Sequence, residues 1–480
     1  MRLIVKNNKN QDCRCGGEVT VQQHVLDVDT LIEGQPLGRL QYVIVFWLCA
    51  FMLIEGYNMQ VVAFTAPAII REWHQTKASF GPVFSATVIG YMIGSMGLGT
   101  MGDRLGRKRV IIGGALTFGL FTGVAAFAGS LTQLLSLRVL AGIGLGGAVS
   151  TGIALAAEFT PHRMRATVIG LMYVGYTVGA SMGGFLSAVL IPRFGWRSVF
   201  VVGGLLPLPL CLVLATVLPE SIRFLALKGA SPERLGAIAR RLRPERNFSG
   251  VTRYTATESR HGNSPVAGLF QEGRALVTVL LWFAFIASLA GHYFLTGWLP
   301  TVLSDAGFSI SQANIALALL QVGGAIGSVL VGLMLDRVGL RIVVLAFLVA
   351  TPAVISLGMI NHPVSLLFIM VTVAGGGVLG GQTALNAVSG IVYPTEMRGT
   401  GAGWALGIGR IGSMAGPVIG GILITKGFSR LSLFSWSSLP LFFAGLAMFV
   451  LSLRLRGGRL SELQATRVEE NLGSSEQLAK

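Results

Sequence analysis

Long stretches without charged residues recur along the chain and alternate with short segments that hold most of the charges. A helix that crosses a bilayer needs about 20 mainly apolar residues. The stretch 342–395 is long enough for two such helices and breaks at 361–363, and the apolar segments 41–70 and 399–425 contain one ionisable residue each. The remaining stretches are 78–102, 110–137, 139–157, 166–192, 198–219, 275–304, 306–335 and 431–453. The pattern predicts an all-α membrane protein with twelve transmembrane helices.

The composition supports this class and excludes others. Hydrophobic residues make up 52% of the chain and charged residues only 12%, whereas soluble domains carry about 25% charged residues. The net charge of +16 would suggest nucleic acid in a soluble protein. Here most of the 37 lysines and arginines fall in the tails and in alternate loops, on one side of the predicted helices. This bias predicts cytoplasmic termini and explains the charge without nucleic acid.

The longest polar stretch, 220–273, divides the chain into halves of six helices. The first forty residues are polar and lack the apolar core of a cleavable signal peptide. We therefore expect a linker with short amphipathic helices between two bundles. The predicted order is a cytoplasmic amino-terminal tail (1–40), a six-helix bundle (41–219), a cytoplasmic linker (220–273), a second six-helix bundle (274–455) and a cytoplasmic carboxy-terminal tail (456–480).

A constant offset of 233 residues relates the two halves. Asp103 and Arg104, between the second and third helices, correspond to Asp336 and Arg337, and Arg165 corresponds to Arg398. The glycines at 142 and 144 correspond to those at 375 and 377. The chain is thus a tandem duplication, an arrangement that suits alternating access around a site between two bundles.

The segment Gly99-Thr-Met-Gly-Asp103-Arg104-Leu-Gly106-Arg107-Lys108 resembles the loop signature of the major facilitator superfamily. Asp103 is expected to accept hydrogen bonds from a helix N-terminus and to pair with an arginine of the other bundle. Helix carboxyl ends or lipid phosphates would hold Arg107 and Lys108. Such a latch would favour one access state. The cations could also be explained without a gating role, by the usual excess of positive charge in cytoplasmic loops. The candidate gating residues are Gly99, Asp103, Arg104, Gly106, Arg107, Lys108, Glu158, Glu220, Arg223, Asp336, Arg337 and Arg398.

Further segments narrow the resemblance to one branch. Pro219-Glu220-Ser221-Ile-Arg223 is similar to a signature of sugar, organic-ion and aromatic-acid porters, and we expect Glu220 to pair with Arg223 and Glu158 to pair with loop arginines. The segments 293–301, 381–386 and 393–412 resemble the aromatic acid:proton symporter family of bacteria. The resemblance implies import of an aromatic acid with protons across the inner membrane by a monomer, without a cofactor.

One segment departs from that family. Its usual Asp-Gly-Phe/Tyr-Asp motif in the first helix reads Glu55-Gly56-Tyr57-Asn58 in this chain. The first carboxylate is retained as glutamate, but the second position is an amide that cannot titrate. Proton coupling would therefore depend on Glu55 alone, or it would differ from that of the family.

Three ionisable residues interrupt the predicted helices: Glu55, Arg138 and Arg410. Each costs roughly 2.5–3.5 kcal/mol at the centre of an inserted helix, so such residues usually face a cavity and serve a function. Arg410 could bind a carboxylate through two parallel hydrogen bonds. A structural pairing of Arg410 with Glu55 or with a carbonyl is the alternative. The candidate substrate-binding residues are Arg410, Asn58, Tyr57, Gln382, Asn386, Trp404, Tyr176, Tyr293 and His292.

Proton coupling is assigned to Glu55 and Arg138. Burial disfavours a charged carboxylate and a nearby arginine favours it, so a carboxyl group that gains and loses an arginine can take up and release a proton. Two alternatives remain: Glu55 could form a static salt bridge, and Arg138 could have a purely structural role. His292 could join a proton relay or serve as a hydrogen-bonded structural residue.

Other functions are weighed against transport. A related porter for another organic ion or a sugar, or a drug exporter, would share most of these features, although a cationic substrate fits Arg410 poorly. An enzyme would need a metal or nucleophile motif, and the sequence contains no His-Glu-x-x-His, Gly-x-Ser-x-Gly or Walker motif. A receptor would need a signalling extension. Cys13 and Cys15 lack a second Cys/His pair, so we expect no metal site.

Overall fold

Helices make up most of the computed structural model, which describes residues 24–33, 35–245, 248, 251–256, 266–271, 273–359, 363–393 and 397–456. The membrane helices of the first half are α1 (Arg39–Glu72), α2 (Lys77–Leu105), α3 (Arg107–Ala125), α4 (Leu131–Glu158), α5 (Arg165–Phe194), α6 (Arg197–Leu205) and α7 (Pro207–Val217). Those of the second half are α10 (Ala275–Asp305), α11 (Ile310–Val338), α12 (Arg341–Ser356), α13 (Val364–Val392), α14 (Arg398–Thr425) and α15 (Arg430–Arg456).

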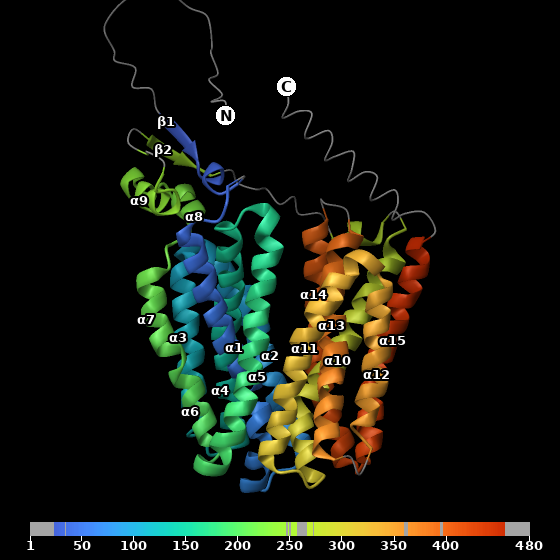
Figure 1. Ribbon diagram of the computed structural model, residues 1–480. Coiled ribbons are helices and arrows are strands. Elements are labelled where there is room, and N and C mark those ends of the chain that lie inside the picture. Colours follow the sequence, from blue (N-terminus) through green and yellow to red (C-terminus); the bar gives the residue numbers. More distant parts are fainter. Residues whose placement is uncertain are drawn as a thin grey trace, which may run out of the picture.

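The helices form two bundles that stand side by side (Figure 1), α1–α7 in one and α10–α15 in the other. Within the described residues, 11 helical segments are long and apolar enough to cross a membrane, and α6 and α7 together form one of them. The apolar α12 is shorter, with 16 residues, and packs against α13 and α15. With α12, these segments account for the twelve predicted spans and confirm the all-α membrane class.

One predicted helix boundary is wrong. The uncharged stretches placed the border between the third and fourth spans at Arg138, whereas α3 ends at Ala125 and α4 begins at Leu131. The side chain of Ser130 accepts a hydrogen bond from the backbone N–H of Gln133 and caps α4. Arg138 therefore lies two turns inside the helix, because its charge is satisfied by neighbouring helices rather than by water.

The duplication is visible in the packing of glycines. A Cβ at Gly90 would collide with the backbone of Val139, and a Cβ at Gly323 would collide with that of Thr372, at the same offset of 233 residues. These contacts bring α2 against α4 and α11 against α13. Because only glycine permits such close approach of two helices, both halves pack by the same rule.

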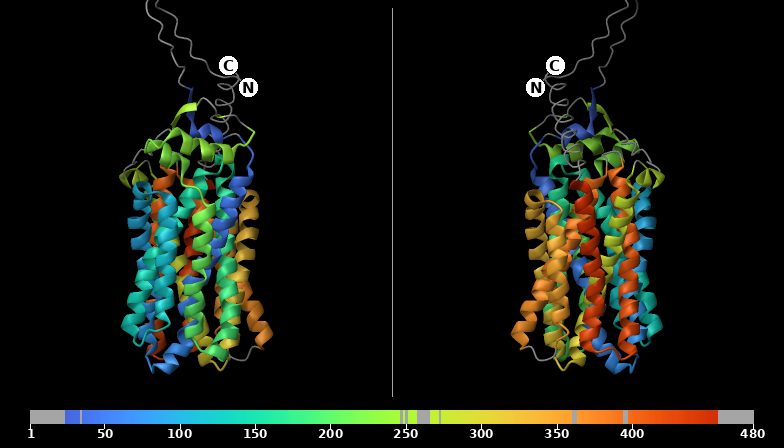
Figure 2. Two further views of the ribbon diagram at one scale, coloured as in Figure 1. Left: turned by 90° about the vertical axis from the view of Figure 1, so that its left-hand side faces the viewer. Right: turned by 90° about the vertical axis from the view of Figure 1, so that its right-hand side faces the viewer.

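A small layer of short helices and strands covers the terminus-bearing end of the first bundle (Figures 1 and 2). It contains β1 (His24–Asp27), η1 (Val28–Leu31), α8 (Ile222–Leu227), α9 (Pro232–Leu242) and β2 (Val251–Thr255), whereas η3 (Val266–Phe270) lies against α10 and α14 of the second bundle. Short helices were expected in the linker. The parallel pairing of β1 from the tail with β2 from the linker was not expected, since each strand alone is too short to give a clear pattern.

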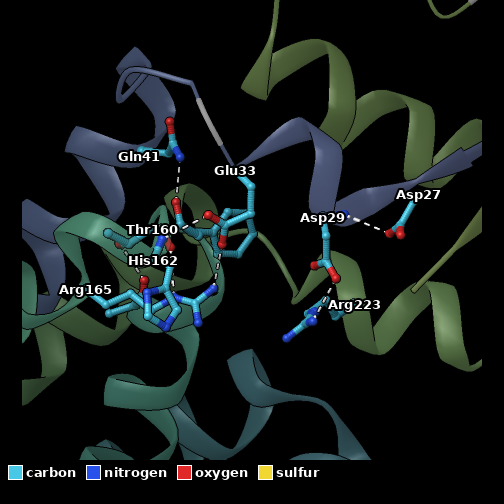
Figure 3. A network of polar contacts seen from close by, with 10 residues as sticks. Asp27, Asp29, Glu33, Gln41, Thr160, His162, Arg165 and Arg223 are labelled. Atoms are coloured by element: carbon cyan, nitrogen blue, oxygen red, sulfur yellow. Dashed lines mark hydrogen bonds and ion pairs between the residues drawn. The ribbon is translucent and has the colours of Figure 1, made fainter. Parts of the chain in front are cut away.

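Polar contacts fasten this amino-terminal segment to the first bundle (Figure 3). Arg223 donates to Asp29 at 2.8 Å, and Arg165 donates to Glu33 at 3.0 Å. The side chain of Gln41 donates to the backbone carbonyl of Phe159 at 2.6 Å. The segment from β1 to the start of α1 thus contacts both the linker and the loop between α4 and α5, and it holds the two together.

The two bundles are linked at the end of the helices away from the chain termini. Lys77 pairs with Asp305 at 2.6 Å, and Arg71 donates to Ser304 at 2.6 Å. The backbone N–H of Ala78 donates to the Thr425 hydroxyl at 3.1 Å. Figure 1 shows the bundles meeting at this end. The residues expected to form the loop latch lie at the opposite end.

Candidate functional site

Glu55 lies in the middle of α1 and is only 4% exposed. Its Oε2 atom has no hydrogen-bond partner among the described residues. The ion pairs that these residues form do not include Glu55 with either Arg138 or Arg410. Glu55 nevertheless interacts electrostatically with Arg410 across the bundle interface. The static salt bridge is therefore not formed in this state, and the two opposite charges remain within electrostatic range.

Arg138 is buried among the helices of the first bundle. It donates to the hydroxyl of Thr87 on α2 at 3.1 Å, to that of Thr122 on α3 at 3.2 Å and to the carbonyl of Asn58 on α1 at 2.9 Å. These three partners are neutral, and they come from three different helices. This geometry matches the structural alternative, since one guanidinium fixes the position of α1 a single turn from Glu55.

Tyr57 and Asn58 face the interior of the first bundle rather than the second bundle. The Tyr57 hydroxyl donates to the carbonyl of Val199 at 2.8 Å. The Asn58 carboxamide donates to the carbonyls of Ile54 and Gly203, at 3.1 and 3.2 Å. The helical turn that directs Glu55 towards the interface directs these two neighbours towards α6, so the structure does not bring them to Arg410.

Arg410 lies on α14 and reaches both bundles. Its Nη1 atom is 3.5 Å from the Tyr293 hydroxyl on α10, and its guanidinium carbon is 5.0 Å from the centre of the Tyr91 ring on α2. An arginine over an aromatic face gains a cation–π interaction, strengthened where water is excluded. Tyr293 was a sequence candidate, whereas Tyr91 was missed, although it is one of only eight tyrosines in the chain.

Arg410 and Glu55 belong to one cluster with four tyrosines. Electrostatic interactions connect Tyr91, Tyr173, Tyr176 and Tyr293 with both charged residues or with one another. Tyr173 and Tyr176 lie on α5, so the cluster draws on helices of both bundles. Tyr173 was missed because its position beside Tyr176 on the interface depends on how α5 packs. The arrangement provides one cation, one carboxyl group and several aromatic rings around a common space.

A narrow pocket between the bundles begins at this cluster. Residues of α1, α2, α5, α10 and α14 line it, including Tyr176 and Tyr293. The polar residue Gln60, five positions after Glu55, also lines the pocket and was not a sequence candidate. An amide in a long apolar helix was the signal that could have found it.

The other sequence candidates lie elsewhere on the second bundle. Gln382 and Asn386 share a face of α13, as predicted from their spacing, with 3.5 Å between the Gln382 amide nitrogen and the Asn386 amide oxygen. His292 packs edge-on against Tyr293, at 5.2 Å between ring centres, and its Nδ1 atom has no partner among the described residues. Trp404 stacks on Trp282 and is 45% exposed. None of these four candidates lines the narrow pocket.

A polar network at the terminus-bearing end contains most of the expected gating residues. The carboxylate of Glu220 accepts the backbone N–H groups of Arg107 and Lys108, at 2.7 and 3.1 Å, and so caps α3. The expectation that Asp103 caps a helix is therefore wrong. Gly106, at φ +101°, turns the chain so that the N-terminus of α3 faces Glu220.

The remaining pairings differ in part from expectation. Arg107 pairs with Glu158 at 2.6 Å, which confirms a partner for that carboxylate, and with Asp103 at 3.2 Å. Asp103 therefore pairs with a residue of its own bundle rather than with an arginine of the other bundle. The Lys108 ammonium binds the carbonyl of Ala215 near the end of α7, as expected for a helix carboxyl end.

Arg223 pairs with Asp29 and not with Glu220, since Glu220 is occupied by α3. Gly99 lies beside Ser150 of α4, and Arg104 is exposed. In the second half, Arg337 is exposed and Gly339 adopts a positive φ like that of Gly106. The side chains of Asp336 and Arg398 lie outside the described residues. The structure leaves the gating role of these residues untested.

Comparison with known proteins agrees with this architecture. The Major Facilitator Superfamily model matches residues 46–309 and 281–475. A gallate transporter of Pseudomonas putida is 39% identical over 425 residues, covering 88% of this chain and 94% of that protein. The 4-hydroxybenzoate transporter PcaK of the same species is 37% identical over 409 residues, covering 84% and 91%. The inward-open structure of the xylose transporter XylE from E. coli has a TM-score of 0.67 at 17% identity, covering 89% and 99%.

Two bundles related by duplication, with a charged and aromatic site between them, define a multi-pass membrane transporter, and this chain belongs to the major facilitator superfamily. Within that superfamily, its similarity to the aromatic-acid transporters places it in the aromatic acid:proton symporter family.

Proposed function

We propose that this protein imports an aromatic carboxylate together with a proton by alternating access. The observation that carries the proposal is the position of Arg410, which faces buried Glu55 and contacts Tyr91 and Tyr293 at the bundle interface. The named relatives carry gallate and 4-hydroxybenzoate, so a benzoate or hydroxybenzoate is the proposed substrate class. Arg410 would bind the carboxylate and the tyrosines would surround the ring.

Glu55 would couple this binding to the proton. Two states of the site satisfy its charges: a neutral, protonated Glu55 with the substrate carboxylate on Arg410, or an ionised Glu55 paired with Arg410 in the absence of substrate. A buried carboxylate without a partner is costly, so substrate and proton would bind and leave together. Arg138 would act as a positioning residue, because it holds α1 beside Glu55.

The bias of cations supports cytoplasmic termini, and the proposed bilayer is the bacterial inner membrane. In this orientation the contacts of Lys77 and Arg71 would close the outer face, as an inward-facing state requires. The proposed transporting unit is a monomer. No cofactor is required, since conformational exchange and the proton gradient supply the driving force.

The test is uptake of radiolabelled 4-hydroxybenzoate, gallate and benzoate into proteoliposomes with an imposed inward proton gradient. We expect accumulation of at least one acid above equilibrium, abolished by a protonophore. A panel of sugars and organic cations in the same vesicles provides the comparison. Uptake of sugars or cations alone, or aromatic-acid uptake indifferent to the gradient, would refute the proposal.

A further inference from the structure

Gln60 is a buried amide at the inner end of the narrow pocket between the bundles. Its side chain is 6% exposed and lines the pocket together with Phe84, Thr87, Tyr293, Thr296 and Pro417. A carboxamide has two N–H donors and a carbonyl acceptor. The side chain of Gln60 forms no hydrogen bond with any other described residue. An amide that lines a pocket without a protein partner is placed to bind a polar group of a ligand.

Three other polar side chains of the pocket already have partners. The Thr87 hydroxyl accepts a hydrogen bond from Arg138 at 3.1 Å. The Thr296 hydroxyl donates to the carbonyl of His292 at 3.1 Å, within its own helix. The Tyr293 hydroxyl lies 3.5 Å from Arg410. Gln60 and Tyr176 line the pocket with both donor and acceptor capacity left for a ligand, since neither side chain has a hydrogen-bond partner among the described residues. Tyr176 belongs to the cluster around Arg410, so Gln60 is the available polar group that lies away from the cation.

The position of Gln60 along α1 gives the orientation of that ligand. Gln60 follows Glu55 by five residues, about 7.5 Å along the helix axis, in the direction away from the termini. Tyr293 contacts Arg410 through its hydroxyl and also lines the pocket, so the pocket continues from the cation towards the sealed end of the bundles. Beyond it, the rings of Phe84 and Trp298 meet at 5.0 Å. A planar acid held at Arg410 would therefore direct the far edge of its ring towards Gln60.

We propose that Gln60 is a specificity-determining residue that binds a ring hydroxyl remote from the carboxylate of the substrate. The proposal rests on the proposed function and narrows its substrate class to aromatic acids hydroxylated at the para position. A para-hydroxyl group can donate to the Gln60 carbonyl and accept from its amide. A benzoate without this hydroxyl leaves the amide unpaired in the pocket, and an ortho-hydroxyl lies beside the carboxylate and cannot reach it.

The test compares 4-hydroxybenzoate, 2-hydroxybenzoate and benzoate as substrates of the wild type and of Gln60→Leu in proteoliposomes. Leucine has a similar size and removes the hydrogen bonds. We expect KM for 4-hydroxybenzoate to rise about tenfold, corresponding to one lost hydrogen bond, while KM for the other two acids stays within about twofold. Thr117→Val is the matched control, since its exposed hydroxyl bonds only to its own helix at Gly113.

Equal weakening of all three acids by Gln60→Leu, or no change in their ratio, would overturn the proposal. If the variant fails to fold, inhibition of the wild type provides a second test. The proposal requires that 4-hydroxybenzoate bind about tenfold tighter than 4-methylbenzoate, whose methyl group is similar in size to the hydroxyl. Equal inhibition by the two analogues would contradict the role of Gln60. Absence of transport of every aromatic acid by the wild type would instead refute the proposed function.

Discussion

The guanidinium of Arg410 lies over the ring of Tyr91, at 5.0 Å from the ring centre, and thereby joins α14 of one bundle to α2 of the other. A guanidinium that packs over an aromatic ring can still bind a carboxylate along its N–H edge. Among the described residues, the only side-chain hydrogen bond of that edge is the long one to Tyr293. Arg410 is thus held in place while its hydrogen-bonding edge stays open to an anion.

Replacement of Arg410 by lysine is expected to weaken substrate binding although the positive charge is kept. Lysine cannot form two parallel hydrogen bonds with a carboxylate and stacks less well on Tyr91. We expect KM for an aromatic acid to rise by about tenfold or more, measured as initial uptake in proteoliposomes. Lys426→Arg, at the end of α14, is the control for expression and insertion. An unchanged KM in Arg410→Lys would show that Arg410 does not bind the carboxylate.

Glu55→Gln is expected to separate exchange from accumulation. Glutamine mimics the protonated acid, so the variant can still bind substrate in both the outward-facing and the inward-facing conformation. It cannot form the ionised Glu55–Arg410 pair that the empty transporter would need to return. Counterflow of labelled acid against unlabelled acid should therefore persist, whereas accumulation driven by a proton gradient should be lost. Both activities are measured in the same vesicles. Gradient-driven accumulation by this variant would show that another group carries the proton.

The pair Lys77–Asp305 is expected to stabilise the state seen in the structure. The side chains are about one-third and two-fifths exposed, so the pair contributes at most about 1 kcal/mol, or a population change of about fivefold. Lys77→Asp should shift the population towards opening at this end, and the double variant Lys77→Asp/Asp305→Lys should restore it. Spin-label distances between the ends of α2 and α10 measure the shift. A double variant that resembles the single one would argue against a direct pairing.

The amino-terminal segment is expected to protect the linker strand. Asp29→Ala/Glu33→Ala removes the partners of Arg223 and Arg165, and each lost surface pair should cost well under 1 kcal/mol. Hydrogen exchange of the amides in β2 should accelerate several-fold, because the strand β1 would detach more often. Amides in α4 serve as the internal reference. Faster exchange throughout α4, or none in β2, would contradict a local clamp.

Much of the fold could be predicted from the sequence because the bilayer imposes strict rules. Helix length and charge placement give the twelve spans, and the offset of 233 residues gives the duplication. The sidedness stays a prediction from the bias of cations. The cost of burying a charge also singled out Glu55 and Arg410 as site residues. The same reasoning misplaced the start of α4, because Arg138 was treated as a helix end although three helices satisfy its donors.

What the sequence by itself determined is therefore what depends on short-range regularity and on transfer into lipid: the helices, the repeat and the rare buried charges. The tertiary structure decided which of these groups meet. It placed Tyr91 beside Arg410 and directed Tyr57 and Asn58 into the first bundle. It also made Glu220 rather than Asp103 the cap of α3, and it paired β1 with β2. Such contacts join residues far apart in the chain, and they follow from the rotation and close packing of whole helices, which no local pattern encodes.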